Sequence, residues 1–423
     1  MRLLVSHTNF PAQFRRLVPA WVEQGHDVVF LCRSHEWHAL KPEGFRLLRY
    51  NLHRQAGGAA IHPYLRRFEQ AVVEGQAAYR AASQLREEGW EPDCIINHVG
   101  FGNGLYLSDA FPEARRIGLF EWYYNAAKSD VDFLPPRQVP PDQQLRLRTW
   151  NAQTLMELAA CHQAVVPTQW QRSQFPPALQ QRLQVIHEGV DTTRLAGLRA
   201  AGLPRPSALP DDPKIEVLTY VSRCFEEYRG FPQAIEAIAR LQQRRAQLHV
   251  LLVGHDGTAY GQARADGRGW AAWARDTVPL DPARTHWLGS LQEAEYHQVL
   301  ACSTVHLYLT VPFVLSWSLL EAMAAGCAIV ASATPPVQEV LEHNGSALLT
   351  DFFDVEAHVS ALDRLLGDQD LRQRLASAAQ QRAQAYSHER GLRGWVDLLG
   401  SQSSCSDPHK PVHTLGTAES IQV

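Results

Sequence analysis

The chain has 423 residues, of which 40 are Lys or Arg and 44 are Asp or Glu, so its formal net charge is −4. At about 100–200 residues per domain, this length predicts two or three domains with well-buried cores. A hydrophobic content of 45% excludes a disordered chain, and the near-neutral charge argues against a general nucleic-acid-binding protein.

The seven cysteines are scattered and form no CxxC pair. They argue against a disulfide framework or a zinc module and favour a reducing compartment, so we expect a cytoplasmic protein without a metal centre. The short set Cys32, His35 and His38 lacks a fourth metal ligand. The apolar start is too short for a signal peptide. The apolar stretch 311–333 has Glu321 at its centre, so we interpret it as a buried helix and strand and not a membrane span.

Strand-type and helix-type runs alternate along the first half of the chain. The first strand is predicted at Leu3–Ser6, and a helix is predicted at residues 12–24 because apolar residues there follow i, i+3, i+4, i+7 spacing. Further strands are predicted at Asp27–Leu31, Cys94–Asn97, Arg116–Phe120 and Gln163–Pro167, and further helices at Leu65–Glu88, Gly104–Phe111 and Gln143–Ala160. This order indicates βαβ units and a parallel sheet covered by helices on both faces.

A proline-rich stretch at residues 195–213 is predicted to be a linker, and the alternation restarts after it. Strands are predicted at Ile215–Val221, Leu248–Val253, Thr285–Leu288, Val305–Leu309 and Ala328–Ala331, and helices at Pro232–Gln243, Glu293–Leu300, Leu319–Ala325 and Val355–Tyr386. We therefore expect an α/β protein with two Rossmann-like, doubly wound domains that face each other across a cleft. Their expected bounds are 1–190 and 191–400, followed by a disordered tail at 401–423.

The strongest candidate for a binding site is the segment 220–230, which follows a predicted strand and precedes a predicted helix. Arg223 and Arg229 place two guanidinium groups on this one loop, and Gly230 allows close backbone approach. Arginine can hold phosphate oxygens with two parallel hydrogen bonds, so the loop is a candidate diphosphate site. The alternative is that both arginines pair with Glu226 and Glu227 at the surface.

A second constellation lies at residues 313–321. Ser318 and Glu321 form the S-x-x-E of a capping box before an apolar run, which alone would explain both residues. The same helix N-terminus would also bind an anion, and a glutamate in its first turn could accept two hydroxyls of a ribose. Both interpretations are open.

Two further candidates lie where predicted strands end. Gly254 and His255 form a glycine turn that either closes a loop or lets a nucleotide approach the backbone. His98 is either a structural histidine or a side chain that faces the cleft.

The glycines at positions 100, 102 and 104 follow a predicted strand and precede Glu121 by about 20 residues, as in a dinucleotide-binding fingerprint. Leu105 stands at the expected third glycine position, however, and the strand is not the first of its domain. An NAD-dependent oxidoreductase is therefore a weaker alternative.

Together, these motifs resemble the retaining family-4 glycosyltransferases with the GT-B fold. In the C-terminal half the resemblance rests on segments 222–230, 253–254, 288–289 and 319–332. In the N-terminal half, segments 9–14, 120–124 and 167–171 resemble a bacterial branch of the family, and 185–191 resembles the segment that crosses between its domains. The resemblance covers roughly residues 1–400 and implies that the last helix packs back on the N-terminal domain.

The resemblance implies transfer of a sugar from a nucleoside-diphosphate sugar to an acceptor hydroxyl, with retention of configuration and without a metal or other cofactor. Arg223 and Arg229 would stabilise the leaving diphosphate, and His98 would contact the donor sugar. The other implied donor-binding residues are Gly254, His255, Ser316, Trp317, Ser318, Leu319 and Glu321, the last on the ribose, and the implied acceptor-side residues are Asn9, Phe10 and Glu121.

Two departures from the family pattern affect these expectations. The first glutamate of the family motif, eight residues before Glu321, is Phe313 here, and residues 8–11 replace the usual Gly-Gly loop after the first strand. A non-catalytic nucleotide-sugar- or glycan-binding protein is therefore the alternative function. The expected partners are the nucleotide-sugar donor and a sugar, lipid-linked or protein acceptor, with no nucleic acid and room for a weak peripheral membrane contact.

Overall fold

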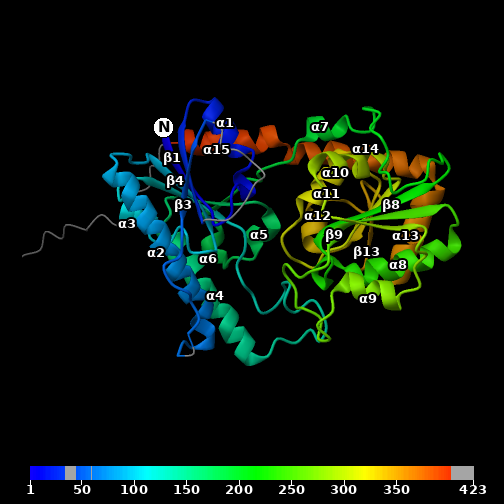
Figure 1. Ribbon diagram of the computed structural model, residues 1–423, viewed down its shortest axis with the longest axis horizontal. Coiled ribbons are helices and arrows are strands. Elements are labelled where there is room, and N and C mark those ends of the chain that lie inside the picture. Colours follow the sequence, from blue (N-terminus) through cyan, green and yellow to red (C-terminus); the bar gives the residue numbers. More distant parts are fainter. Residues whose placement is uncertain (34–43, 59, 402–423) are drawn as a thin grey trace, which may run out of the picture.

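The structure is a computed structural model that describes residues 1–33, 44–58 and 60–401. His35 and His38 of the short metal-ligand set, and the expected disordered tail from residue 402 onward, lie outside the described residues. Figure 1 shows two lobes side by side, each built on its own twisted sheet.

The N-terminal lobe holds a seven-stranded parallel sheet in the order β3-β2-β1-β4-β5-β6-β7. Its strands are β1 (Arg2–Ser6), β2 (Asp27–Arg33), β3 (Arg46–Tyr50), β4 (Cys94–Val99), β5 (Arg115–Phe120), β6 (Gln163–Val166) and β7 (Leu183–Val185). Its helices are η1 (Ala12–Phe14), α1 (Leu17–Glu23), η2 (Pro63–Leu65), α2 (Arg66–Glu87), α3 (Leu107–Ala110), α4 (Pro141–Ala160), α5 (Gln169–Ser173) and α6 (Pro177–Gln180).

The C-terminal lobe holds a six-stranded parallel sheet in the order β10-β9-β8-β11-β12-β13. Its strands are β8 (Glu216–Cys224), β9 (Leu248–His255), β10 (Thr285–Gly289), β11 (Val305–Tyr308), β12 (Ile329–Ser332) and β13 (Leu348–Thr350). The helices from residue 192 onward are α7 (Thr192–Ala196), η3 (Glu227–Arg229), α8 (Phe231–Arg244), α9 (Trp270–Thr277), α10 (Glu293–Cys302), α11 (Trp317–Ala324), α12 (Pro335–Val340), α13 (Val355–Gly367), α14 (Gln369–Ala383), η4 (Gln384–Tyr386) and α15 (His388–Gly400).

Both sheets are buried on both faces, which explains why their central strands read as continuous apolar runs. In β4, Cys94 and Ile96 belong to the core on one face of the sheet and Ile95 to the core on the other. In β12, Ile329 and Val330 divide between two cores in the same way. The prediction of two doubly wound α/β domains is therefore confirmed.

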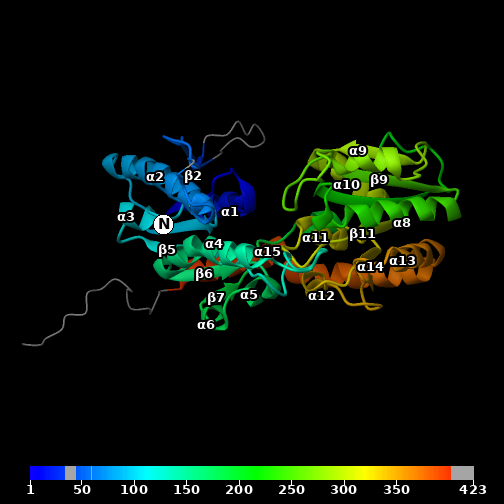
Figure 2. The same ribbon diagram turned by 90° about the horizontal axis from the view of Figure 1, so that it is seen from below.

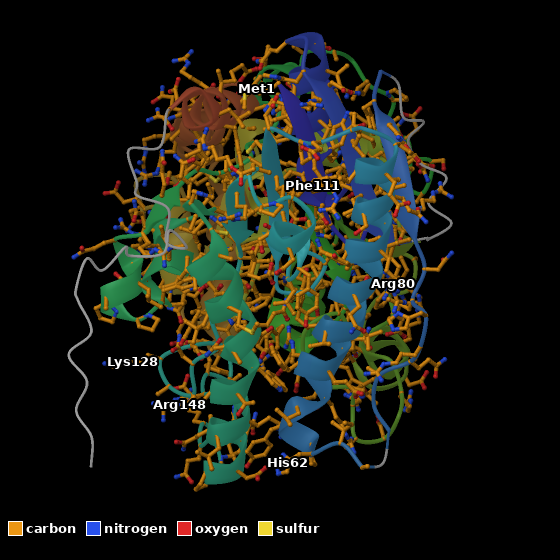
Figure 3. All side chains as sticks on the ribbon, turned by 90° about the vertical axis from the view of Figure 1, so that its left-hand side faces the viewer. Met1, His62, Arg80, Phe111, Lys128 and Arg148 are labelled. Carbon is orange, nitrogen blue, oxygen red and sulfur yellow. The ribbon has the colours of Figure 1, made fainter. Side chains whose placement is uncertain are left out.

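Helices α2 and α4 extend side by side beyond the N-terminal sheet. Figure 3 views this lobe from its outer side, with His62, just before α2, and Arg148, on α4, toward the same end. The Tyr64 hydroxyl donates a hydrogen bond of 2.5 Å to Asp142 in the first turn of α4. This contact fixes the starts of the two helices to each other.

The last helix, α15, returns from the C-terminal lobe to the N-terminal one (Figures 1 and 2). Trp395 at its centre is only 1% exposed. Its ring lies 5.9 Å from that of Trp21 on α1 and 6.5 Å from that of Phe14. The core of the N-terminal domain is therefore completed by residues from the far end of the chain.

A second connection between the lobes is the bridging segment (residues 121–140), which follows β5. Its Phe133 stacks on Phe353 at 5.1 Å and meets Phe352 edge-on at 5.2 Å. Its Asp130 accepts a hydrogen bond of 2.8 Å from the hydroxyl of Tyr228. The N-terminal domain thus contributes a segment that is packed into the C-terminal domain.

The apolar stretch 311–333 forms helix α11 and strand β12, both buried within the C-terminal lobe. This confirms the expected helix and strand. Within the described residues, no helix has the length and apolar character that crossing a membrane requires.

Candidate functional site

The carboxyl ends of the strands in the two sheets meet at the interface between the lobes. Trp122, directly after β5, lies 4.7 Å from Phe313, which follows β11. The indole Nε1 of Trp317, at the start of α11, donates a hydrogen bond of 2.5 Å to Glu188, in the crossing segment (residues 186–191) between the domains. In parallel α/β sheets this is the edge at which ligands bind.

Arg229 is held rigidly at this edge of the C-terminal sheet. Its guanidinium is 7% exposed, and Nη1 donates to the Thr310 hydroxyl at 2.8 Å, the Val314 carbonyl at 3.2 Å and the Tyr308 hydroxyl at 3.4 Å. The same Tyr308 hydroxyl accepts from the backbone N–H of Ser316 at 3.0 Å, which places Arg229 beside the N-terminus of α11. None of the hydrogen bonds of Arg229 to the described residues involves Nε or Nη2, so these two groups remain for a ligand.

Arg223 lies near the end of β8 and is exposed. It forms no ion pair or hydrogen bond with the described residues, so the alternative that it pairs with Glu226 or Glu227 is wrong for this arginine. Glu226 is fully buried, and its Oε2 accepts hydrogen bonds of 3.0–3.1 Å from the backbone N–H groups of residues 259, 260 and 261. Through these bonds Glu226 fixes the loop after β9.

That loop carries Tyr260, which sequence reasoning did not single out. Its ring lies 5.3 Å from the guanidinium carbon of Arg229 and 5.2 Å from the ring of Phe313. Phe313 also contacts Tyr228 at 5.7 Å as well as Trp122. Phe313 thus stands in an aromatic cluster that joins both lobes, where the family pattern has a carboxylate.

The N-terminus of α11 differs from the predicted capping box. Ser316, not Ser318, is the N-cap residue, and its hydroxyl accepts from the backbone N–H of Ser318 at 3.3 Å. The capping-box explanation of Ser318 and Glu321 is therefore wrong. The Leu319 side chain has no exposed surface and packs in the core, so only the backbone of Leu319 belongs to the exposed start of the helix, and its N–H donates to the Ser316 carbonyl at 3.2 Å.

Glu321 is half-buried in the second turn of α11, and its Oε2 accepts a hydrogen bond of 2.9 Å from the Tyr296 hydroxyl. Burial raises the pKa of Glu321, although the bond from Tyr296 and the nearby charges of Arg16 and Arg15 oppose the rise. Both arginines belong to the N-terminal domain, where Arg16 pairs with Asp191 at 3.3 Å. Glu321 therefore also faces the interface between the lobes.

The glycine near the end of β9 has a structural explanation. Gly254 has a φ of 145°, and a Cβ there would lie 2.4 Å from the Ser222 carbonyl oxygen. The close approach of the β8 backbone therefore explains why a glycine is needed here, without a bound nucleotide. His255 is exposed, and its Nε2 lies 3.3 Å from the Sγ of Cys224.

Across the interface, the N-terminal polar cluster (His7, Gln13, His98 and Glu121) lies at the ends of β1, β4 and β5. The Nε2 of His98 is 3.2 Å from Glu121 Oε2, and Gln13 donates to Glu121 Oε1 at 2.6 Å. His7 stacks edge-on against His98 at 4.7 Å. The structure therefore brings together His98 and Glu121, which were predicted separately, and adds His7 and Gln13.

Burial and the neighbouring side chains together set the protonation of this cluster. Burial and the neighbouring His98 hold the pKa of His7 well below its usual range, so His7 is neutral. Burial alone would raise the pKa of Glu121, but His98, Gln13 and His187 outweigh it and lower that pKa. Glu121 is therefore a charged hydrogen-bond acceptor at neutral pH.

The other two acceptor-side residues are placed differently. The Phe10 ring is 7% exposed and packs against Phe30 at 4.9 Å, so the expected contact of Phe10 with an acceptor is not possible for this side chain. Asn9 is half-buried, and its backbone N–H donates to His7 Nδ1 at 2.8 Å. Asn9 thereby orients His7, and Phe10 anchors the loop in the core.

Gly102 and Gly104 are explained by packing and Gly100 by its φ of 119°, which argues against a dinucleotide site. A Cβ at Gly102 would lie 2.3 Å from the Ala71 carbonyl oxygen on α2, and one at Gly104 would lie 2.1 Å from Nδ2 of Asn97. The adjacent cavity, lined by Asn97, Gly104 and Glu157, has a volume of only about 20 Å³, room for a single water. Nor does any group of three or more His, Cys, Asp or Glu side chains within the described ranges form a candidate metal site.

Glu157 beside this cavity provides a test of stability against pH. Burial raises its pKa from an ordinary 4.5 to about 7, although Gln153 and Asn97 donate hydrogen bonds to it. Because the folded state binds the proton more tightly, this group's contribution to stability is present below pH 4.5 and is lost as the pH rises through 7. Replacing Glu157 with Gln should therefore raise Tm relative to the wild type more at pH 8 than at pH 5. Thermal melts at both pH values, with Glu87→Gln at the exposed end of α2 as control, measure this; an equal shift at both would contradict it.

Solved structures with the same fold cover nearly the whole chain. Sucrose-phosphate synthase from Thermosynechococcus elongatus is 20% identical, with a TM-score of 0.67 over 94% of this chain and 98% of its own. An α,α-trehalose-phosphate synthase from Burkholderia xenovorans is 14% identical, with a TM-score of 0.67 over 94% and 98%. A glycosyltransferase from Rickettsia africae is 13% identical, with a TM-score of 0.63 over 94% and 97%. No curated protein sequence matches the chain.

Family models match both halves of the chain. Residues 24–195 match the glycosyl transferase family 4 group, and residues 205–382 match the glycosyl transferases group 1. Each model falls on one of the two lobes, and both lobes contribute to the site described above. The chain is therefore a glycosyltransferase of the family-4 type with the two-domain GT-B fold.

Proposed function

We propose that this enzyme transfers a sugar from a nucleoside-diphosphate sugar to an acceptor hydroxyl with retention of configuration, and that it does so without a metal ion. The observation that carries the proposal is the position of Arg229 beside the N-terminus of α11, with Nε and Nη2 left for a ligand. An arginine and a helix N-terminus side by side suit a diphosphate. Arg223, exposed near the end of β8, would add a second positive charge.

In this mechanism the bond between the anomeric carbon and the diphosphate oxygen breaks as the acceptor oxygen bonds to the same carbon. The acceptor proton passes to the leaving diphosphate oxygen on the same face of the sugar. Negative charge grows on that diphosphate, and Arg223, Arg229 and the α11 N-terminus would stabilise it. Retention is also the subject of work on the structurally similar trehalose-6-phosphate synthase, 14% identical to this chain.

The N-terminal polar cluster would receive the acceptor. Glu121 carries a charge and accepts hydrogen bonds, while His98, 3.2 Å away, lies at the end of β4. A hydroxyl that donates to Glu121 would be held at the sheet edge facing α11. Closure of the two lobes around both substrates would exclude water and so limit hydrolysis of the donor.

A nucleotide-sugar panel tests the proposed reaction. The purified protein is titrated with UDP-, GDP- and ADP-sugars by calorimetry, and the donor that binds is incubated with acceptor mixtures with and without EDTA. Proton NMR of the product then reports its anomeric configuration. Retained configuration with EDTA present supports the proposal. Inversion would contradict the proposed stereochemistry, loss of activity with EDTA would contradict metal independence, and binding without turnover would favour the non-catalytic alternative.

Glu321 is expected to bind the donor ribose, and Glu321→Gln tests this role. A neutral amide accepts ribose hydroxyls less strongly than a carboxylate, so we expect nucleotide binding to weaken by about tenfold. Because Ser316 caps α11 and Glu321 does not, Tm should change little. Calorimetry with the free nucleotide and a thermal melt measure both quantities. A lowered Tm with unchanged nucleotide affinity would assign Glu321 a structural role instead.

A further inference from the structure

Glu188 lies in the crossing segment, and its backbone is fixed from both sides. Gly189 has a φ of 82°, and a Cβ there would lie 2.4 Å from the Ser387 carbonyl oxygen. A Cβ at Gly391 on α15 would lie 2.8 Å from the backbone carbonyl of Glu188 itself. The start of α15 is therefore packed directly on the backbone of this part of the chain.

Glu188 is 7% exposed, and only one of its two carboxylate oxygens accepts a hydrogen bond. Its Oε1 accepts the hydrogen bond of 2.5 Å from Trp317 Nε1. Its Oε2 is buried and has no hydrogen-bond partner among the described residues. His187 Nδ1 is 3.9 Å away but accepts from the backbone N–H of Gly189 at 2.8 Å, so its lone pair is already used there. A buried carboxylate oxygen without a donor is costly, and such atoms require an explanation.

Glu188 has neighbours in both halves of the proposed site, the diphosphate position and the N-terminal polar cluster. Trp317 is the first residue of α11, beside the proposed diphosphate position. On the other side, His187 is close enough to Glu121 to lower the pKa of that carboxyl. A carboxylate would repel the diphosphate itself, but it is a good acceptor for sugar hydroxyls. Phe313, by contrast, offers no carboxylate to a sugar at the position where the family pattern has one.

We infer that Glu188 is the carboxylate that binds hydroxyls of the transferred sugar, through its free Oε2. This inference rests on the proposed function and adds to it the residue that recognises the sugar portion of the donor. Trp317 orients the carboxylate, and the rigid crossing segment holds it between the diphosphate position and the N-terminal polar cluster. The affinity gained from the sugar, over that of the bare nucleotide, depends on Glu188.

Glu188→Gln separates this role from a structural one. The amide oxygen of glutamine can still accept from Trp317 Nε1, so a purely structural Glu188 predicts no change. If Glu188 binds the sugar, the amide lacks the charge that strengthens hydrogen bonds from hydroxyls. We expect the nucleotide sugar to bind about 10- to 100-fold more weakly while the free nucleoside diphosphate binds within twofold of the wild type.

The experiment measures two Kd values by calorimetry, one for UDP-glucose and one for UDP, and compares their ratio between variants. If the wild type prefers guanine, GDP-mannose and GDP replace this pair. The control is Glu339→Gln, because Glu339 also joins the two lobes but both of its oxygens accept backbone N–H groups, those of Gln169 and Trp170. A ratio changed in Glu188→Gln and unchanged in Glu339→Gln supports the inference. An unchanged ratio in Glu188→Gln overturns the inference on Glu188 and leaves the proposed function intact. A wild type that binds none of the UDP, GDP and ADP pairs overturns both the inference and the proposed function.

Discussion

Replacing Arg223 with alanine is expected to lower kcat/KM for the nucleotide sugar by about 10²–10³-fold without a change in Tm. The side chain is exposed and makes no ion pair or hydrogen bond with the described residues, so its removal leaves no buried group unpaired. Its proposed contribution arises only when negative charge develops on the diphosphate. Steady-state kinetics with the donor identified by the nucleotide panel, and a thermal melt of the same protein, measure the two quantities.

The matched control is Arg240→Ala on α8, where the arginine pairs with Glu236 and Glu356 at the surface. It removes the same charge from the C-terminal domain away from the strand ends and should leave turnover unchanged. Near-normal turnover of the Arg223 variant would remove Arg223 from the mechanism. Equal losses in both variants would point to a general effect of charge.

The second large effect is expected for Trp395→Ala, which should destabilise the N-terminal domain by about 3–5 kcal/mol. Trp395 is 1% exposed and packs against Trp21 and Phe14, so its removal leaves a cavity between α15 and the rest of the core. Calorimetric melting should show a lowered transition for the N-terminal domain. Free nucleotide, which we propose binds the C-terminal domain, should still protect the other transition.

Val396→Ala is the control for this prediction, since Val396 on the same helix is 37% exposed. Its effect should be small because little buried surface is lost. If both variants melt like the wild type, α15 contributes little to the N-terminal core.

The central architecture could be predicted from the sequence because the inner strands are buried on both faces. The strand Cys94–Val99 begins with an apolar run and is buried along its whole length, and its bounds were predicted within two residues. The strands that sequence reasoning missed are β3, β7 and β13, all at sheet edges. Two of them have only three residues, and β3 has charged residues at two of its five positions, so none has a strong hydrophobic pattern.

The placement of a candidate residue could be predicted where a short motif contained it, as for Arg223 near the end of β8 and Arg229 in the following η3. It could not be predicted where tertiary packing brings distant residues together. Glu188 becomes notable only because Trp317, 129 positions later, donates to one oxygen and leaves the other unpaired. Likewise, nothing local indicates that Ser316 and not Ser318 caps α11, since both serines precede the same apolar run.

The return of α15 also has a consequence for the order of events during synthesis. The N-terminal sheet is complete in sequence by β7, yet the helix that covers its Trp21 side is synthesised only after the strands and helices of the C-terminal domain. The C-terminal domain, whose strands and covering helices are contiguous, can fold before its neighbour is finished. A stalled or clipped nascent chain would therefore present an open apolar face on the half that was translated first.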